Sequence, residues 1–200
     1  MRHAAVLCLA LWALALPLAA QPHPPGLRPA DTERWEAFDA HLGRALRQAL
    51  AAGDPADIAV LTDALAGTPD LIRPEGEWSC RTIKMGGLVP LTVYGAFRCR
   101  VTADGPDRWR IEKLTGSQRL VGHLLAGDGG LSAAYLGVGF VAGGPAMPYA
   151  KLPPADQTPQ EPGQTIAQVG LWEQPSPDRA RLLMPAPLLE SEFDLLVLSR

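Results

Sequence analysis

This chain of 200 residues has few of the residue types that build reactive sites, with four histidines, three cysteines and 6% aromatic residues. After residue 20 it has His23, His41 and His123, and no spacing among them is typical of metal ligands. His41 falls within a predicted helix, where we expect a surface position and not a ligand. The sequence therefore predicts no metal site.

The familiar catalytic patterns are also missing. Ser117 lies in Thr-Gly-Ser-Gln, which lacks the glycine spacing of a nucleophile elbow. Residues 137–143 look like a dinucleotide-binding loop, but the last spacing is wrong and prolines follow where a helix is needed. No pair of carboxylates stands in a setting that would tune it, and we interpret Glu190, Glu192 and Asp194 as charges that keep a strand edge soluble. We therefore predict neither a catalytic residue nor a cofactor.

Positive charge is in slight deficit, and the one long apolar run lies near the start of the chain. The 18 Lys and Arg against 21 Asp and Glu give a net charge of −3, which argues against a nucleic-acid partner.

The apolar run, 4–16, follows Arg2 and precedes small residues that end at Ala20. This pattern is typical of a secretory signal peptide over residues 1–20, cleaved after about Ala20.

Such a leader predicts a periplasmic or secreted protein with no stable membrane anchor after cleavage. The apolar run of 13 residues is short for a bilayer span, and an uncleaved anchor is the alternative. Cleavage removes Cys8 and leaves Cys80 and Cys99 in an oxidising compartment, where such a pair forms a disulfide. The alternative is two reduced, buried cysteines. A disulfide between them closes a loop of 20 residues, which the chain-entropy model equates with about 3 kcal/mol of stability.

Glycine and proline are abundant by contrast, with 20 of each spread between short strand-like runs. This distribution is typical of an all-β body. Before it, residues 21–30 form a proline-rich linker, and residues 31–68 predict a helical hairpin. Apolar residues recur at helical spacing from Trp35 onward, and Pro55 suits the first position of a second helix. We expect the apolar stripe of this hairpin to pack on the β body.

From residue 76 the apolar period changes to two, and turn-forming residues separate most of the extended segments. These segments are 77–85, 92–102, 108–113, 119–125, 131–141, 164–173, 178–185 and 192–199. An even number of mostly adjacent strands favours a closed or nearly closed antiparallel barrel, because closure removes exposed edges. We therefore predict a mainly β (α+β) protein, in which a helical hairpin precedes an eight-stranded barrel-like sheet over residues 76–199.

The two cysteines predict the register of the first hairpin. If Cys80 faces Cys99 directly, Met85 faces Tyr94 across an eight-residue connection. A shorter turn then joins the second strand to the third.

The alternation of side chains along these strands predicts the barrel interior. Trp78, Phe97 and Trp109 fall on the face that carries the cysteines, and Leu120 joins them from the fourth strand. A barrel of eight strands is narrow, so these residues either fill it or line a small cavity.

Five arginines near the other face are the candidate anion-binding residues: Arg81, Arg98, Arg100, Arg110 and Arg119. In the predicted registers Arg81 faces Arg98 and Arg100 faces Arg110, which is an unfavourable arrangement. One interpretation is a site for phosphate or carboxylate groups, with Arg119 at the mouth of a turn. The alternative is a sheet face exposed to solvent.

Residues 142–163 interrupt the strand rhythm with six prolines. Connections of this length are usually functional or disordered. We expect this one near a barrel mouth, where it could act as a lid.

Two stretches of the chain resemble known protein families. Gly76-Glu-Trp78 is similar to the Gly-x-Trp motif that opens lipocalin-type barrels, which supports barrel shape and not ligand class. Gly-Glu-Trp-Ser-Cys-Arg-Thr-Ile-Lys at 76–84, Leu-Thr-Val-Tyr-Gly-Ala-Phe-Arg-Cys at 91–99 and Lys-Leu-Thr-Gly-Ser-Gln-Arg at 113–119 together resemble an exported bacterial family. This is the domain of unknown function numbered forty-eight ninety-three, and the resemblance covers about residues 31–198. It implies no activity, substrate or catalytic residue.

We therefore expect a monomeric, non-catalytic binding protein, whose partner is a small amphiphilic molecule in the barrel or an envelope component on its surface. One alternative is a protein-binding module that resembles a protease inhibitor or a chaperone. Another is an unrecognised hydrolase that uses Arg119 and a carboxylate. A sizeable apolar cavity favours the first hypothesis, and a filled core with a protruding ordered segment favours the second. Arg119 and a carboxylate in one cleft favour the third.

Overall fold

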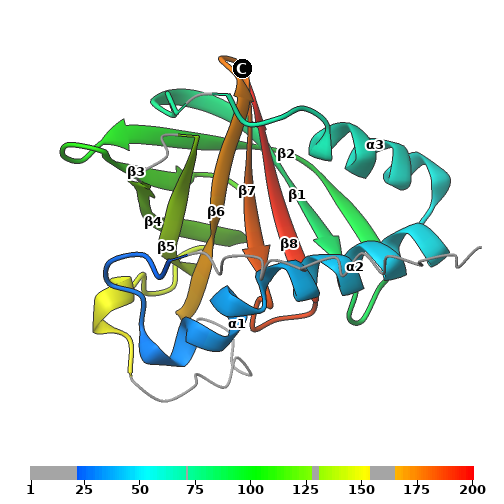
Figure 1. The fold of residues 1–200 in the computed structure, drawn as a ribbon, viewed down its shortest axis with the longest axis horizontal. Coiled ribbons are helices and arrows are strands. Elements are labelled where there is room, and N and C mark those ends of the chain that lie inside the picture. Colours follow the sequence, from blue (N-terminus) through cyan, green and yellow to red (C-terminus); the bar gives the residue numbers. More distant parts are fainter. Residues whose placement is uncertain (1–21, 71, 128–130, 154–164) are drawn as a thin grey trace, which may run out of the picture.

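The structure is a computed structural model, and it describes residues 22–70, 72–127, 131–153 and 165–200. The predicted signal peptide and part of the long connection, 154–163, lie outside the described residues. Within the described ranges, eight strands form a closed antiparallel barrel in chain order, and helices precede it (Figure 1). The predicted fold class is confirmed. No helix in this part of the chain is long and apolar enough to cross a membrane.

The helical elements are η1 (Pro29–Asp31), α1 (Thr32–Glu36), α2 (Phe38–Ala52), α3 (Pro55–Leu65) and η2 (Tyr149–Lys151). The strands are β1 (Gly76–Met85), β2 (Leu91–Ala103), β3 (Arg108–Lys113), β4 (Gln118–Ala126), β5 (Ser132–Val141), β6 (Ile166–Ser176), β7 (Arg179–Pro185) and β8 (Phe193–Ser199). The predicted first helix is divided at Ala37, where φ is −88° and ψ is 16°. Asp54 caps α3 by accepting a hydrogen bond from the Ala56 amide, and Pro55 takes its first position.

The helices α2 and α3 lie along the outer face of the barrel (Figure 1). Ile83 and Met85 of β1 point outward and are buried under the two helices, together with Leu195 of β8. Phe38 of α2 meets Phe193 edge to face, with ring centroids 5.4 Å apart. Because the helices cover these strands, the outward-facing positions near the strand ends are apolar as well.

The inside of the barrel is filled by side chains over most of its length. The buried cluster there comprises Trp78, Cys80, Cys99, Val101, Ile111, Leu120, Leu124, Ala133, Tyr135, Trp172, Ala180, Leu182, Met184, Leu196 and Leu198. Within it, Trp78 and Trp172 meet edge to face, with ring centroids 6.1 Å apart. A narrow barrel packed in this way leaves no room for a ligand along its axis.

One end of the barrel is closed by the segment that precedes β1 and by the C-terminal residue. The indole of Trp78 donates a hydrogen bond to Pro74 O at 2.8 Å. Fully buried Gln174 accepts one from the Arg73 amide at 2.9 Å. The guanidinium of Arg200 lies 4.0 Å from the centroid of the Trp78 ring. Access to the interior is therefore left to the opposite end.

The predicted disulfide between Cys80 and Cys99 is present, with Cα atoms 5.9 Å apart. The register predicted from it is wrong. Cys80 pairs with Phe97 and Cys99 pairs with Trp78, so the disulfide joins diagonal neighbours across β1 and β2.

The connection after β1 is also shorter than predicted. Met85 pairs with Leu91 instead of Tyr94, and residues 86–90 form the turn. Gly86 and Gly87 adopt φ values of 68° and 86°, a left-handed conformation that glycine adopts without strain and that this tight turn requires.

Candidate functional site

Three charged side chains are buried inside the barrel near its open end. Lys84 of β1, Lys113 of β3 and Asp194 of β8 are each 7% exposed. Side chains alternate along a strand, so Lys84 points inward because Ile83 and Met85 point outward under the helices. Lys84 and Asp194 are direct partners in the β1–β8 register. We call this end the mouth and define it by Lys84, Lys113, Gln118, Arg119, Gln168 and Asp194.

Lys84 and Asp194 are held by the connection between β7 and β8, residues 186–192. The Lys84 ammonium donates to Glu190 Oε2 at 2.7 Å, with side-chain exposures of 9% for Lys84 and 47% for Glu190. Ser191 Oγ donates to Asp194 Oδ1 at 2.6 Å. Burial raises the pKa of Asp194 to about 6, although Lys84 and the Ser191 hydrogen bond act in the opposite direction.

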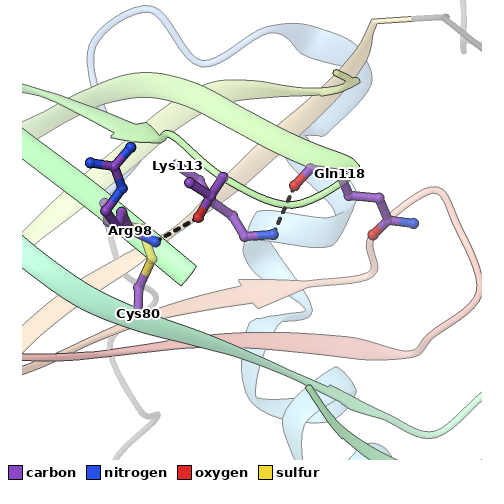
Figure 2. The surroundings of a disulfide bond; sticks show 6 residues. Cys80, Arg98, Lys113 and Gln118 are labelled. Atoms are coloured by element: carbon purple, nitrogen blue, oxygen red, sulfur yellow. Dashed lines mark hydrogen bonds between the residues drawn. A yellow bond between two sulfur atoms is a disulfide. The ribbon is translucent and has the colours of Figure 1, made fainter. Parts of the chain in front are cut away.

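Lys113 has a different environment. Figure 2 shows its amine directed at the backbone carbonyl of Gln118, to which it donates at 2.7 Å. The same amine lies 3.8 Å from the centroid of the Phe97 ring. Burial, and then the charges of Arg119 and Lys84, lower the pKa of Lys113 to about 8. Among the described residues no carboxylate forms an ion pair with Lys113, so its charge lacks a direct counter-ion.

We distinguish two of the hollows that mouth residues line in the described part of the chain. The first, which we call the Lys84 pocket, has a volume of about 80 Å³. Its wall includes the polar residues Lys84, Gln118, Arg119, Gln168 and Asp194 and the apolar residues Val141, Ile166 and Leu189. The second, the Lys113 pocket, has a volume of about 200 Å³ and is lined by Thr82, Tyr94, Phe97, Lys113, Ser117, Gln118 and Glu190.

The size and lining of these hollows limit what they can hold. A cavity of about 150 Å³ takes a benzene molecule, so the smaller Lys84 pocket admits only a few heavy atoms. Charged and amide groups lie inside it, and Leu189 and Val141 contribute apolar surface to its wall. The arrangement therefore suits the polar end of a small amphiphile.

Comparison with known families gives one match. Residues 26–198 match the family described as a domain of unknown function, DUF4893. The chain belongs to the DUF4893 family. No curated protein and no solved structure matches it. The DUF4893 match begins before the helices and ends in β8, so the family unit includes both the helices and the barrel.

The candidate interior residues of this DUF4893 barrel lie in or against the filled core. Trp78 and Leu120 are buried in it, and the half-buried Phe97 and Trp109 pack against it. Trp78 and Leu120 contribute to the filled core, although each also borders a surface hollow. Phe97 borders the Lys113 pocket. The similarity to lipocalin-type barrels stays a prediction.

Of the candidate arginines, Arg119 reaches the mouth, where it lines the Lys84 pocket and donates through Nε to Gly116 O at 2.6 Å. The predicted Arg–Arg pairings are wrong. Arg81 pairs with Ala96, Arg98 with Ser79, and Thr102 with Arg110. At these positions the register differs from the prediction by two residues, which keeps each side chain on its face but changes its partner.

The real neighbours of Arg100 are acidic. It pairs across β1 with Glu77, to which its side chain forms an ion pair, and across β3 with Glu112. Arg110 contacts the same Glu112 at 2.8 Å. The predicted stripe is thus a mixed-charge, solvent-facing surface, and its four members other than Arg119 do not border the Lys84 pocket.

Sequence reasoning missed the buried charges of the DUF4893 mouth. The interpretation of Asp194 as a soluble strand edge is wrong, because it points into the barrel. Glu192 instead binds α2, accepting a hydrogen bond from Arg44 Nε at 2.8 Å and lying 2.7 Å from His41 Nδ1. A signal was present, since Lys84 and Asp194 each stand alone between two apolar residues of a strand.

Proposed function

We propose that this protein binds a small amphiphilic molecule at the mouth of the barrel and acts in the cell envelope without catalysing a reaction. The observation that carries this proposal is the Lys84 pocket, which places buried polar groups beside apolar surface at the open end of a filled barrel. The polar end of the ligand enters this pocket. Its apolar part lies over the rim formed by Val141, Phe140 and Leu189.

The filled core supports a site at the mouth in place of the barrel centre. Trp172, Tyr135 and Leu182 are fully buried inside the barrel, and a hydrocarbon chain there would have to displace them. Lys113 also supports a site at the mouth, because a buried charge without a counter-ion lowers the stability of the fold. Buried charges that do not stabilise a fold are often kept for function.

The proposed location rests on the signal-peptide pattern and on the disulfide. Disulfides persist in oxidising compartments and are rare in the cytosol, so the Cys80–Cys99 bond supports export.

A titration with octanoate, a simple amphiphile, tests the proposed function. The Cβ of a residue at position 139 would lie 2.9 Å from Gln168 Nε2 and 3.2 Å from Ile166 Cγ1, so Gly139→Leu fills the Lys84 pocket. We expect calorimetry to detect octanoate binding to the wild type and its loss in Gly139→Leu.

Gly95→Leu is the matched control, because a Cβ at position 95 meets no atom within 4 Å. It should bind octanoate as the wild type does. Equal binding by Gly139→Leu and the wild type would show that the ligand sits elsewhere.

A second candidate function is hydrolysis, because Arg119 and the carboxyl group of Asp194 line the same pocket. A carboxyl group with a pKa of about 6 suits proton transfer near neutral pH. Release of octanoate from its nitrophenyl ester by the wild type, and its loss in Asp194→Asn, would establish this activity over binding alone.

A further inference from the structure

We propose that Glu190 occupies the position of the ligand's anionic head, and that an amphiphile with an oxyanion head binds by displacing this side chain from Lys84. This inference rests on the proposed function, and it names the chemical class of the ligand. The carboxylate of Glu190 acts as an internal competitor.

The two partners of this ion pair differ in how firmly they are held. Lys84 extends into the barrel from the next-to-last pair of the β1–β8 register, and only 9% of its side chain is exposed. Glu190 reaches it from a connection, and 47% of its side chain is exposed to water. Removal of Glu190 from the contact therefore exposes a fixed, buried cation to the two mouth pockets, while Glu190 itself becomes solvated.

The backbone of the β7–β8 connection can stay in place while this happens. Leu88 N donates to Glu190 O at 3.1 Å, and Glu192 binds Arg44 at 2.8 Å on the outer side. Only the side-chain torsions of Glu190 need to change.

The conformation of this connection is also unusual. Ala186 and Glu190 adopt φ values of 41° and 68°, which lie in the left-handed region that side chains other than glycine seldom occupy. Backbone strain of this kind is concentrated at ligand clamps and switch regions. Glu190, one of these two residues, is the one whose carboxylate accepts the hydrogen bond from Lys84.

The charges around the mouth favour an anion once Glu190 has moved. Lys84 of β1, Lys113 of β3 and Arg119 of β4 are cationic, and Asp194 of β8 faces them. Gln118 and Gln168 are uncharged hydrogen-bonding groups in the same wall. An incoming carboxylate or phosphate restores the countercharge that Glu190 supplies in this structure.

The test compares Glu190→Gln with the wild type by calorimetry at neutral pH. Octanoate and octyl phosphate are the anionic probes, and octanol is the neutral one. We expect Glu190→Gln to bind the better anionic probe about fivefold more tightly, since a partly exposed ion pair no longer competes. Octanol binding should not change. The comparison of octanoate with octyl phosphate tells which oxyanion head the mouth takes.

Glu192→Gln is the matched control, because Glu192 lies in the same connection but binds the outer helix α2. Its affinity for both anions should equal that of the wild type. Glu190→Asn serves as a second variant, since asparagine tolerates the left-handed backbone. Lys84→Met, added to Glu190→Gln, should abolish the tighter binding of the anionic probes.

The outcomes separate the two proposals. Binding of the anions by the wild type with no gain in Glu190→Gln or Glu190→Asn overturns the role of Glu190 and leaves the site standing. Failure of the wild type and both variants to bind any of the three probes overturns the proposed function and this inference together.

Discussion

The residues that distinguish this protein are the three buried charges at the mouth. Each occupies an inward strand position and is 7% exposed; Lys84 and Asp194 stand between two apolar residues, whereas Lys113 follows Glu112. Strand alternation therefore explains how they are placed, but not why charge is kept there. A buried carboxyl group and a buried amine both cost stability in their ionised forms.

Asp194 should make the stability of the fold depend on pH. Burial raises its pKa from 3.8 to about 6, so the folded state holds the proton more tightly than the unfolded state. The resulting stabilisation is complete below about pH 4 and is lost as the pH rises through about 6. We expect the unfolding free energy of the wild type, relative to Asp194→Asn, to fall over this interval by at most about 3 kcal/mol.

Urea unfolding at a series of pH values measures this effect. Asp70→Asn, at an exposed position, should keep the wild-type profile. Parallel pH profiles for the wild type and Asp194→Asn would contradict the burial of the carboxyl group.

At the scale of elements, the strand pattern and the turn residues predicted the barrel, and its details depend on packing. Alanine favours helices, so nothing local marks the break at Ala37. The break separates Trp35, which packs on the outer face of β5 and β6, from α2, which packs under α3 and on β1 and β8. The predicted register of the first hairpin was wrong for a related reason. A disulfide can join two residues that face each other directly or two that are diagonal neighbours, so the cysteines alone do not determine the register.

The disulfide ties β1 to β2 beside the mouth, and its removal tests the contribution of that hairpin. Since it closes a loop with a sequence separation of 19, we expect Cys80→Ala/Cys99→Ala to lower the unfolding free energy by about 3 kcal/mol. Both cysteines are fully buried, so part of the loss reflects packing. Urea unfolding of oxidised wild type and the double variant gives the difference. A difference in unfolding free energy near zero would contradict this and show that the disulfide does not stabilise the hairpin.

At the scale of the whole molecule, the fold closes one end of a filled barrel and leaves hollows at the other, where we propose that a ligand binds. The mouth joins residues of β1, β3, β4, β6 and β8, which lie far apart in the sequence, and the β7–β8 connection borders it. Local patterns predicted Arg119 at a turn, but they could not show that Lys84, Lys113 and Asp194 converge on it. That convergence exists only after the barrel closes.

The most direct measurement is a crystal structure of the protein with octanoate. We expect the carboxylate of octanoate within hydrogen-bond distance of Lys84 Nζ, the Glu190 side chain turned to solvent and the hydrocarbon chain over Val141 and Leu189. Octanoate bound on the outer surface, or inside the barrel between Trp78 and Trp172, would contradict it.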